Sequence, residues 1–370
     1  TQVCADRTSN EWQQRLHFDV SAMRACQLTG GCAADASKLA PAAFAYNERA
    51  GVSDPNAIVF VPLRAPSGEI DTNAATVTKT QSNVAMLGVL QAQYRGRPIE
   101  PMVLRAPAGS CIEVTLRNHL PQQMPDGPQA VALGAGEGAY SHNLMSMITD
   151  GFNTNQFRIS SSISLSAPML ASHIQRSDGS NVGINGIEMG AATEDAYKQG
   201  SLVAPCSAGD TEGIGCKRNY VWWAGDYLLG ADGLRKSGQE IEFGALPLRS
   251  FGDVVKQPAH GAVGALVIGP KGSKLCPPSV DARNAPGGSD VQATICDAAD
   301  KPLYRDAVLV LQDAVDARIK GDPLPNIAGA EEPDDYGAKA VNYRSDPIWA
   351  RRGGDPSVPF EERAAEFDFA

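Results

Sequence analysis

The chain has 370 residues, of which 43% are hydrophobic and 20% charged, so it is long enough to bury a sizeable core and has a globular composition. Its formal net charge is −10 and no basic run is interleaved with aromatic residues, which argues against a nucleic-acid partner. No stretch has the ~18 or more apolar residues of a membrane span, and the N-terminus TQVCADRTSN lacks the regions of a signal peptide. We therefore expect a mature, soluble chain.

The first predicted element is helical. Apolar side chains recur at spacings of three to four residues within 9 to 45, a period typical of a helix. These side chains are Trp12, Leu16, Val20 and Met23. We interpret residues 1–50 as an N-terminal helical cap.

Strand-like runs follow over residues 51–275. The pattern is clearest in CIEVTLRN, where Ile112, Val114 and Leu116 alternate with Cys111, Glu113, Thr115 and Arg117, as in a half-buried strand. The predicted strands are 57–63, 85–94, 101–106, 111–120, 219–226, 240–249 and 261–270. Together with 37 glycines and 25 prolines, they predict a mostly β protein, a Greek-key sandwich with long loop insertions between Pro121 and Asn219.

The C-terminal part is predicted to be a separate and incomplete unit. A segment rich in Pro, Gly and Asp reads as a linker over 276–300, and AVLVLQDAV begins a new strand at residue 307. The stretch 301–370 offers too few strands to close a sandwich. We interpret it as the start of a second domain of the same type as the first.

Eight cysteines indicate a disulfide-bonded protein of an oxidising compartment. Their even number and the absence of a Cys-x-x-Cys spacing disfavour a zinc site. We expect disulfides within three pairs of cysteines that are close in sequence, which leaves Cys4 and Cys111 without a local partner. Spacing alone does not decide the pairing. The local pairs are Cys26 with Cys32, Cys206 with Cys216, and Cys276 with Cys296.

Six segments, in sequence order, resemble large bacterial multicopper oxidases of the manganese-oxidase type. They are VLRAPAGSCIEVTLRNHLP, SDGSNVGIN, NYVWWAGD, FGDVVKQPAHGAVGALVIGPKGS, AVLVLQDAVDARI and AVNYRSDPIWAR. The resemblance covers roughly residues 55 to 370. It implies cupredoxin-like domains, a periplasmic, cell-surface or secreted setting, and a chain that continues past Ala370.

The resemblance also implies copper, held by two His and one Cys at a blue-copper site and by His-x-His pairs at a three-copper cluster. A two-residue spacing on a strand aims both imidazoles at one side, where they can bind one metal group. The chain has five histidines, none of them in a His-x-His pair, and no Cys followed closely by His and Met. We therefore expect the copper sites to lie outside this chain, in a continuation or a partner chain.

Two places remain as metal candidates within the chain. His142 with Met145 and Met147 offers soft donors suited to Cu(I), although Met at these spacings is more often core filling. His260, before a buried strand, is the other candidate, and the alternative is a turn histidine bonded to the backbone. No catalytic residue can be assigned, because the chain has no GxSxG, GxxxxGK[ST] or HExxH motif.

The remaining polar and aromatic residues have structural interpretations. We place His17 on the cap helix, His119 on a loop surface and His173 in an exposed stretch. The pair Trp222 and Trp223 reads as core packing on the two faces of one strand rather than as an electron path. An acidic run could gather a divalent cation, but a solvated loop is the simpler reading. It comprises Glu331, Glu332, Asp334 and Asp335.

Two functional hypotheses of different class follow. The first is the N-terminal cupredoxin portion of a multicopper-oxidase-like protein, which oxidises a metal ion or a phenol with dioxygen through copper held elsewhere. The second is a non-catalytic, extracytoplasmic structural or binding module, with the oligomeric state left open. A third, an unrelated Ca²⁺- or carbohydrate-binding sandwich, requires all six matches to be accidental.

Overall fold

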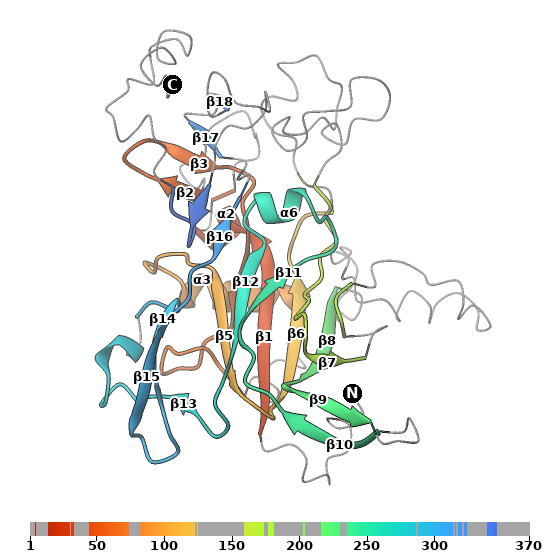
Figure 1. Ribbon diagram of the computed structural model, residues 1–370. Helices are drawn as coiled ribbons and strands as arrows, with labels where there is room; N and C mark the ends of the chain where they lie inside the picture. The colour runs from red at the N-terminus through yellow and green to blue at the C-terminus, as the bar shows by residue number, and fades with distance from the viewer. Residues whose placement is uncertain are drawn as a thin grey trace, which may run out of the picture.

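The structure of the protein is a computed structural model (Figure 1). The described residues are 4, 14–29, 31–32, 44–73, 82–122, 124, 159–173, 177–180, 203, 216–229, 235–285, 288–313, 315, 317–319, 322–323 and 339–345. They are mostly β, as expected from composition and alternation. No described helix is long and apolar enough to cross a membrane.

The largest sheet has five strands in the order β4-β1-β6-β8-β7. Its central strands β1 and β6 run parallel, and every other neighbouring pair is antiparallel (Figure 1). The strands are β1 Arg15–Arg24, β4 Ile58–Pro62, β6 Cys111–Asn118, β7 Ala171–Ser172 and β8 Lys217–Trp223.

A second sheet of three strands packs against the first. Its order is β11-β12-β5, with β12 antiparallel to β11 and parallel to β5. One continuous apolar cluster joins the inward side chains of both sheets, among them Phe18 of β1, Val114 of β6 and Leu266 of β12. Such burial of alternate residues is what drives two sheets together. The strands are β5 Met102–Pro107, β11 Gly244–Arg249 and β12 Val263–Gly269.

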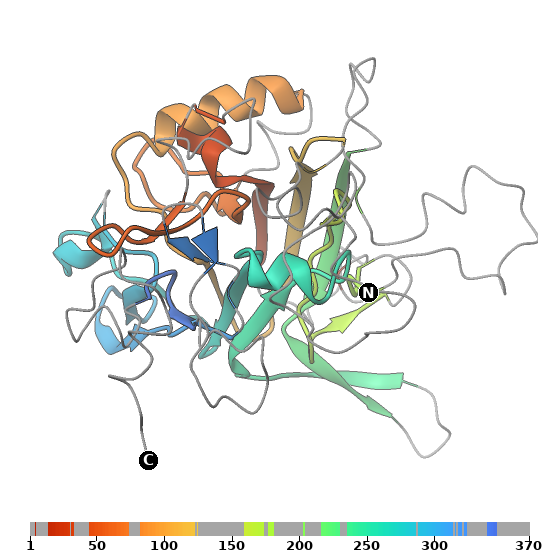
Figure 2. The same cartoon turned by 90° about the horizontal axis from the view of Figure 1, so that it is seen from above.

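The alternation in β6 is confirmed, but its second face is not open to solvent. Ile112, Val114 and Leu116 lie in the core between the sheets, whereas Thr115 and Arg117 on the other face are also buried. Asn83, at the start of helix α3 (Asn83–Gln93), accepts a hydrogen bond from the Arg117 guanidinium at 3.1 Å. Helix α3 lies on the side of the first sheet away from the second (Figure 2).

The predicted N-terminal helix is wrong for residues 15–24, which form the central strand β1. Leu16 and Val20 are four residues apart, a spacing that fits both a helix and an alternating strand. In β1 they share the core face with Phe18 and Ala22. Helix α2, Ala25–Thr29, follows this strand directly.

The predicted strand at 85–94 is also wrong, because it is most of helix α3. The run AMLGVLQAQY is apolar without strict alternation and rich in good helix formers. Ser82 caps its start by accepting a hydrogen bond from the Ala85 amide at 3.3 Å. Met86 and Leu90, one turn apart, bury the inward face in a second apolar cluster.

A third sheet lies beside β5 and carries residues that the sequence had assigned to a linker and to a second domain (Figure 1). Strand β14 pairs with both β13 and β15, so the expected boundary at 276–300 cuts through one sheet. Its elements are β13 Lys274–Leu275, η4 Ala282–Asn284, β14 Gln292–Cys296 and β15 Pro302–Ala307.

Later C-terminal strands also join earlier ones rather than starting a separate described domain. Strand β17 pairs with β3, and the buried Tyr343 ring lies edge-on to Phe44 at 5.2 Å between ring centres. The strands involved are β2 Phe44–Asn47, β3 Val52–Asp54, β16 Leu311–Gln312, β17 Arg318–Ile319, β18 Asp322–Pro323 and β19 Ala340–Val341. A long-range pairing of this kind leaves no trace in local sequence.

The remaining described elements are a short helix and a projecting ribbon. They are α6 Lys256–Ala259, β9 Gly225–Leu229 and β10 Arg235–Glu240. The antiparallel ribbon β9-β10 extends away from the sandwich (Figure 2).

Disulfides connect both near and distant parts of the chain. Cys26–Cys32 and Cys276–Cys296 are formed, the two local pairs expected from spacing. Cys4 and Cys111 form a third, which spans 107 residues. Cys216 is disulfide-bonded as well, while Cys206, its expected partner, lies outside the described residues.

Candidate functional site

Of the predicted metal candidates, His260 lies within the part of the chain that the structure describes. His142, Met145 and Met147 lie outside the described residues, as does the acidic run at 331–335. His260 follows α6, is 1% exposed, and its Nδ1 lies 2.8 Å from the Asp54 carboxylate. Its backbone carbonyl accepts a hydrogen bond from the Ile58 amide at 2.7 Å, so this histidine holds a turn against β4.

Two other histidines sit differently from the sequence prediction. His17 is a buried residue of β1, not of a helix, and its ring nitrogens lie 3.2 Å from Glu113 and 3.0 Å from Thr115 on β6. His119 is half-buried rather than on the surface, and its Nε2 lies 3.1 Å from the Ser21 hydroxyl. Burial, together with the nearby Arg117 guanidinium, lowers the pKa of His119 to about 4. His173 is exposed, as expected.

The described histidines do not fit a copper ligand set. They stand on different elements, and the rings of His17, His119 and His260 each contact separate side chains of the protein. Among the described residues, no three side chains of His, Cys, Asp or Glu converge as a metal site would need.

Trp222 and Trp223 pack on opposite faces of the first sheet, as expected from the sequence. Trp222 lies in the core between the sheets and stacks on Tyr220 at 6.0 Å between ring centres. Trp223, on the opposite face, is buried beside the Cys4–Cys111 disulfide. Both rings are 0–1% exposed and therefore stabilise the sheet.

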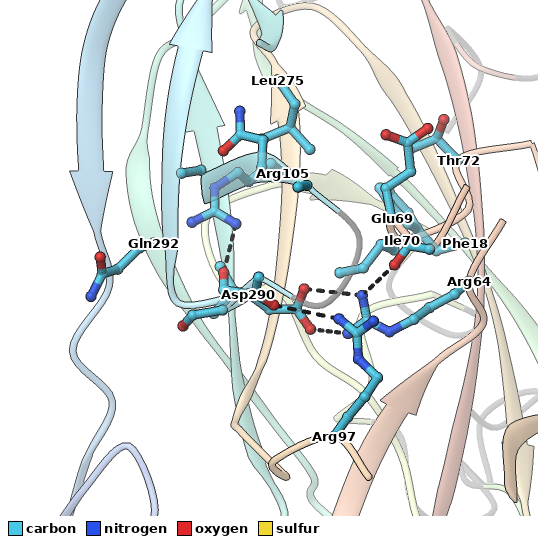
Figure 3. A pocket seen from close by; sticks show the side chains of 17 residues that line it. Phe18, Arg64, Glu69, Ile70, Thr72, Arg97, Arg105, Leu275, Asp290 and Gln292 are labelled. Carbon is cyan, nitrogen blue, oxygen red and sulfur yellow. Dashed lines mark hydrogen bonds and ion pairs between the residues drawn. The ribbon is translucent and has the colours of Figure 1, made fainter. Parts of the chain in front are cut away.

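The most chemically distinctive place in the described structure is a pocket with both charged and apolar lining residues, between the sandwich and the third sheet (Figure 3). Three arginines from separate segments line it. Arg64 follows β4, Arg97 follows α3, and Arg105 projects from β5. Asp290, just before β14, stands among the three guanidinium groups (Figure 3).

Charge-assisted hydrogen bonds connect the arginines to the third sheet. Arg64 binds the Asp290 carboxylate through two nitrogens, one of them at 3.2 Å. Arg105 binds Asp306 of β15 in the same two-pronged way, at 3.0 and 2.7 Å, and donates to the Asp290 carbonyl at 2.8 Å. Arg97 makes one long bond of 3.4 Å, to the Gly288 carbonyl. Such forked pairs give geometric specificity as well as energy.

The loop that carries Asp290 is held from a second side. The Glu100 carboxylate accepts hydrogen bonds from the Ser289 hydroxyl at 2.9 Å and from the Asp290 amide at 2.9 Å. The segment before β14 is therefore positioned by a carboxylate as well as by arginines.

Arg64 is the most buried of the three arginines, at 5% exposure. Burial acts to lower its pKa, but the Tyr94 phenol and the Asp290 carboxylate outweigh burial, so the pKa of Arg64 is raised. The guanidinium also lies 4.9 Å from the centre of the Tyr94 ring, in a cation–π arrangement. Its Nε is buried and has no hydrogen-bond partner in the described structure.

The pocket adjoins a second hollow, and some residues line both. The first, between the three arginines, has a volume of about 60 Å³, and the residues that line a neighbouring one of about 260 Å³ include Leu16, Val267 and Ile295. Tyr304 of β15 contributes a phenol to the larger hollow. The pKa of this phenol is raised, mainly by burial and in second place by the nearby Asp306 carboxylate. Arg105 lines both hollows.

The residues that form this pocket come from segments far apart in the sequence. Arg105 is a visible signal in retrospect, since it is the one charged residue in the buried strand MVLRAP. Its partner Asp306 is 201 residues away, in a segment assigned to another domain. Local pattern cannot reveal a pair at such a separation.

Comparison with known proteins does not identify a family for this chain. No protein-family model matches it, and no curated protein matches it either. A functional assignment therefore rests on its own residues and geometry.

Proposed function

We propose that this chain is the N-terminal, cupredoxin-like portion of a multicopper-oxidase-like protein that couples oxidation of a metal ion or a phenol to reduction of dioxygen. In this proposal the copper sites lie outside the described residues, in a continuation or a partner chain. The chain supplies a rigid, disulfide-bonded support in an extracytoplasmic compartment, where disulfides persist.

The observation that carries the proposal is where the resembling segments lie. VLRAPAGSCIEVTLRN comprises β5, a turn and β6; NYVWW belongs to β8; and HGAVGALVIG contains β12. These segments are far apart in sequence, yet β6 pairs with β8 and β5 pairs with β12. The resemblance therefore falls on the paired strands of the two core sheets.

The turn between β5 and β6 supports the same assignment, because it carries the chain from one sheet to the other. Gly109 has a φ of +82°, a conformation that favours glycine, and its Cα faces Glu240 closely. Its amide donates to the Ala224 carbonyl and the Ala108 amide donates to the Gly269 carbonyl, at 2.8 and 2.9 Å. The segment APAGS is thus needed to join the two layers.

Copper content of two purified samples tests the proposal. One sample is residues 1–370, and the other is the complete product of the gene that encodes them, each loaded with copper and freed of loosely bound metal. Elemental mass spectrometry is expected to find far less than one copper ion per chain in the first. The second is expected to bind copper stoichiometrically and to consume dioxygen with an electron-rich phenol.

Two outcomes would contradict the proposal. Stoichiometric copper in residues 1–370 would place the sites within the chain, and the variants His142→Ala and His260→Ala would then locate them. A complete gene product that binds no copper, alone or with its neighbouring chain, would favour the non-catalytic binding module.

A further inference from the structure

We propose that the pocket between Arg64, Arg97 and Arg105 binds a small oxyanion, a carboxylate or a phosphate. Nothing in the copper chemistry requires such a site. The proposal rests on the hydrogen-bond donors, charge and size of this pocket (Figure 3).

One hydrogen-bond donor of a charged, buried side chain is unsatisfied at this pocket. Arg64 is 95% buried, and its Nε has no hydrogen-bond partner among the described residues, although its two terminal nitrogens bind Asp290. Buried polar groups in proteins nearly always have a partner, and an exception at a cavity indicates a water or an ion. Arg64 reaches into the pocket beside Arg97 (Figure 3).

The three arginines that line the pocket differ in whether a carboxylate pairs with them. Among the described residues, Asp290 pairs with Arg64 and Asp306 pairs with Arg105, whereas the hydrogen bond of Arg97 is to the Gly288 carbonyl. A guanidinium carries five N–H donors, so Arg97 keeps most of its donors for a ligand. Glu69 also lines the pocket, but its carboxylate points toward Thr72, away from Arg64 and Arg97 (Figure 3).

Size favours a small anion. The hollow of about 60 Å³ exceeds the roughly 10–15 Å³ that one water molecule needs, so it accommodates a group of several atoms. It is much smaller than the roughly 300–1,000 Å³ of drug-sized ligand sites. A planar carboxylate or a phosphate matches both this size and the forked geometry of guanidinium donors.

The test titrates copper-free residues 1–370, with disulfides intact, with sodium phosphate and separately with sodium acetate. Ionic strength is held constant with sodium chloride, and binding is followed by calorimetry and by the thermal unfolding midpoint. We expect saturable binding of at least one of the two anions, with a raised midpoint. Binding of phosphate alone would assign a phosphoryl ligand, and binding of acetate alone a carboxylate ligand.

Variants of the partly exposed arginine keep the test independent of folding. Arg97→Gln is expected to weaken binding at least tenfold, because a charge-assisted hydrogen bond is lost, and Arg97→Lys is expected to retain part of the affinity. The control is Arg95→Gln, which also removes one arginine charge, two residues before Arg97. Arg95 is exposed and lies outside this pocket, so this variant should bind the anion as tightly as the parent chain does.

The proposal is overturned if neither anion binds beyond the effect of chloride, or if Arg97→Gln and the parent bind equally well. In the first case, water accepts the hydrogen bond of the Arg64 Nε. Because no copper is present in either arm, these outcomes are independent of the oxidase proposal.

Discussion

At the scale of single residues, buried charged side chains form ion pairs, as Arg117 and Asp19 do. Arg117 and Asp19 are 0% and 2% exposed, and the Arg117 Nε lies 3.0 Å from both carboxylate oxygens of Asp19. This pair joins the parallel strands β1 and β6 on their outer face. His119 lies just beyond the end of β6 and remains neutral there, because burial and Arg117 both disfavour its protonation.

The lowered pKa of His119 predicts a pH-dependent loss of stability. The unfolded histidine binds a proton near pH 6.5, whereas the folded one does so only near pH 4. Between these values the unfolded state binds more protons, so the free energy of unfolding falls as pH drops from 6.5 toward 4, by about 3 kcal/mol. Urea unfolding across this range should show a shallower pH dependence for His119→Gln than for the parent.

The exposed His173 provides the control for this measurement. His173→Gln should reproduce the parent's pH dependence, because its side chain stands in solvent. Equal slopes for the parent and His119→Gln would show that His119 is not the group that titrates.

At the scale of elements, side-chain ion pairs rather than backbone bonds dock the third sheet on the sandwich. Arg105 of β5 reaches Asp306 of β15 and the carbonyl of Asp290, while Arg64 reaches the Asp290 carboxylate. A smaller apolar contact supports this docking, in which Val103 of β5 packs with Val291 and Val308. The position of β14 and β15 therefore depends strongly on paired charges.

Removing Arg105 should loosen this sheet selectively. Arg105→Gln leaves Asp306 partly buried without its guanidinium, and we expect a loss of about 3 kcal/mol in the free energy of unfolding. Hydrogen exchange should rise in β14 and β15 before it rises in β1 and β6. Lys274→Gln breaks the exposed pair with Asp300 and should cost at most about 1 kcal/mol. Uniform exchange across all sheets in Arg105→Gln would argue against a docked unit.

At the scale of the whole molecule, distant segments are tied into one structure. Strand β17 joins the sheet of β2 and β3, and the Tyr343 hydroxyl donates to the Gly261 carbonyl at 2.6 Å. The Cys4–Cys111 disulfide fastens the N-terminus to β6, across the largest loop that a described disulfide closes. Closing a long loop removes more freedom from the unfolded chain than closing a short one.

The disulfides are therefore expected to differ in their contribution to stability. Replacing Cys4 and Cys111 by alanine should lower the free energy of unfolding by about 5 kcal/mol, because the closed loop spans 107 residues. The same change at Cys26 and Cys32, which close a loop of 6, should cost about 2 kcal/mol. Denaturant unfolding without reductant measures both. Equal losses would mean that native packing, not loop length, sets the contribution.

The features that could be predicted from the sequence are those that depend on residues close together in the chain. The strands at 57–63, 101–106, 111–120 and 261–270 were recognisable from alternation and turn residues, and two short-range disulfides from spacing. Errors arose where local pattern is ambiguous. The four-residue spacing of Leu16 and Val20 fits two periods, and the run at 85–94 alternates too weakly to separate strand from helix.

The sequence by itself thus determined the β-rich class of the protein, most of its core strands and its use of local disulfides. Only the tertiary structure decided that β1 lies inside a sheet, between β4 and β6, and that the C-terminal strands join N-terminal ones. It alone brought Arg64, Arg97 and Arg105 around Asp290. The physical reason is that periodicity reports which face of a segment is buried, whereas pairing across hundreds of residues is chosen by packing and charge in three dimensions.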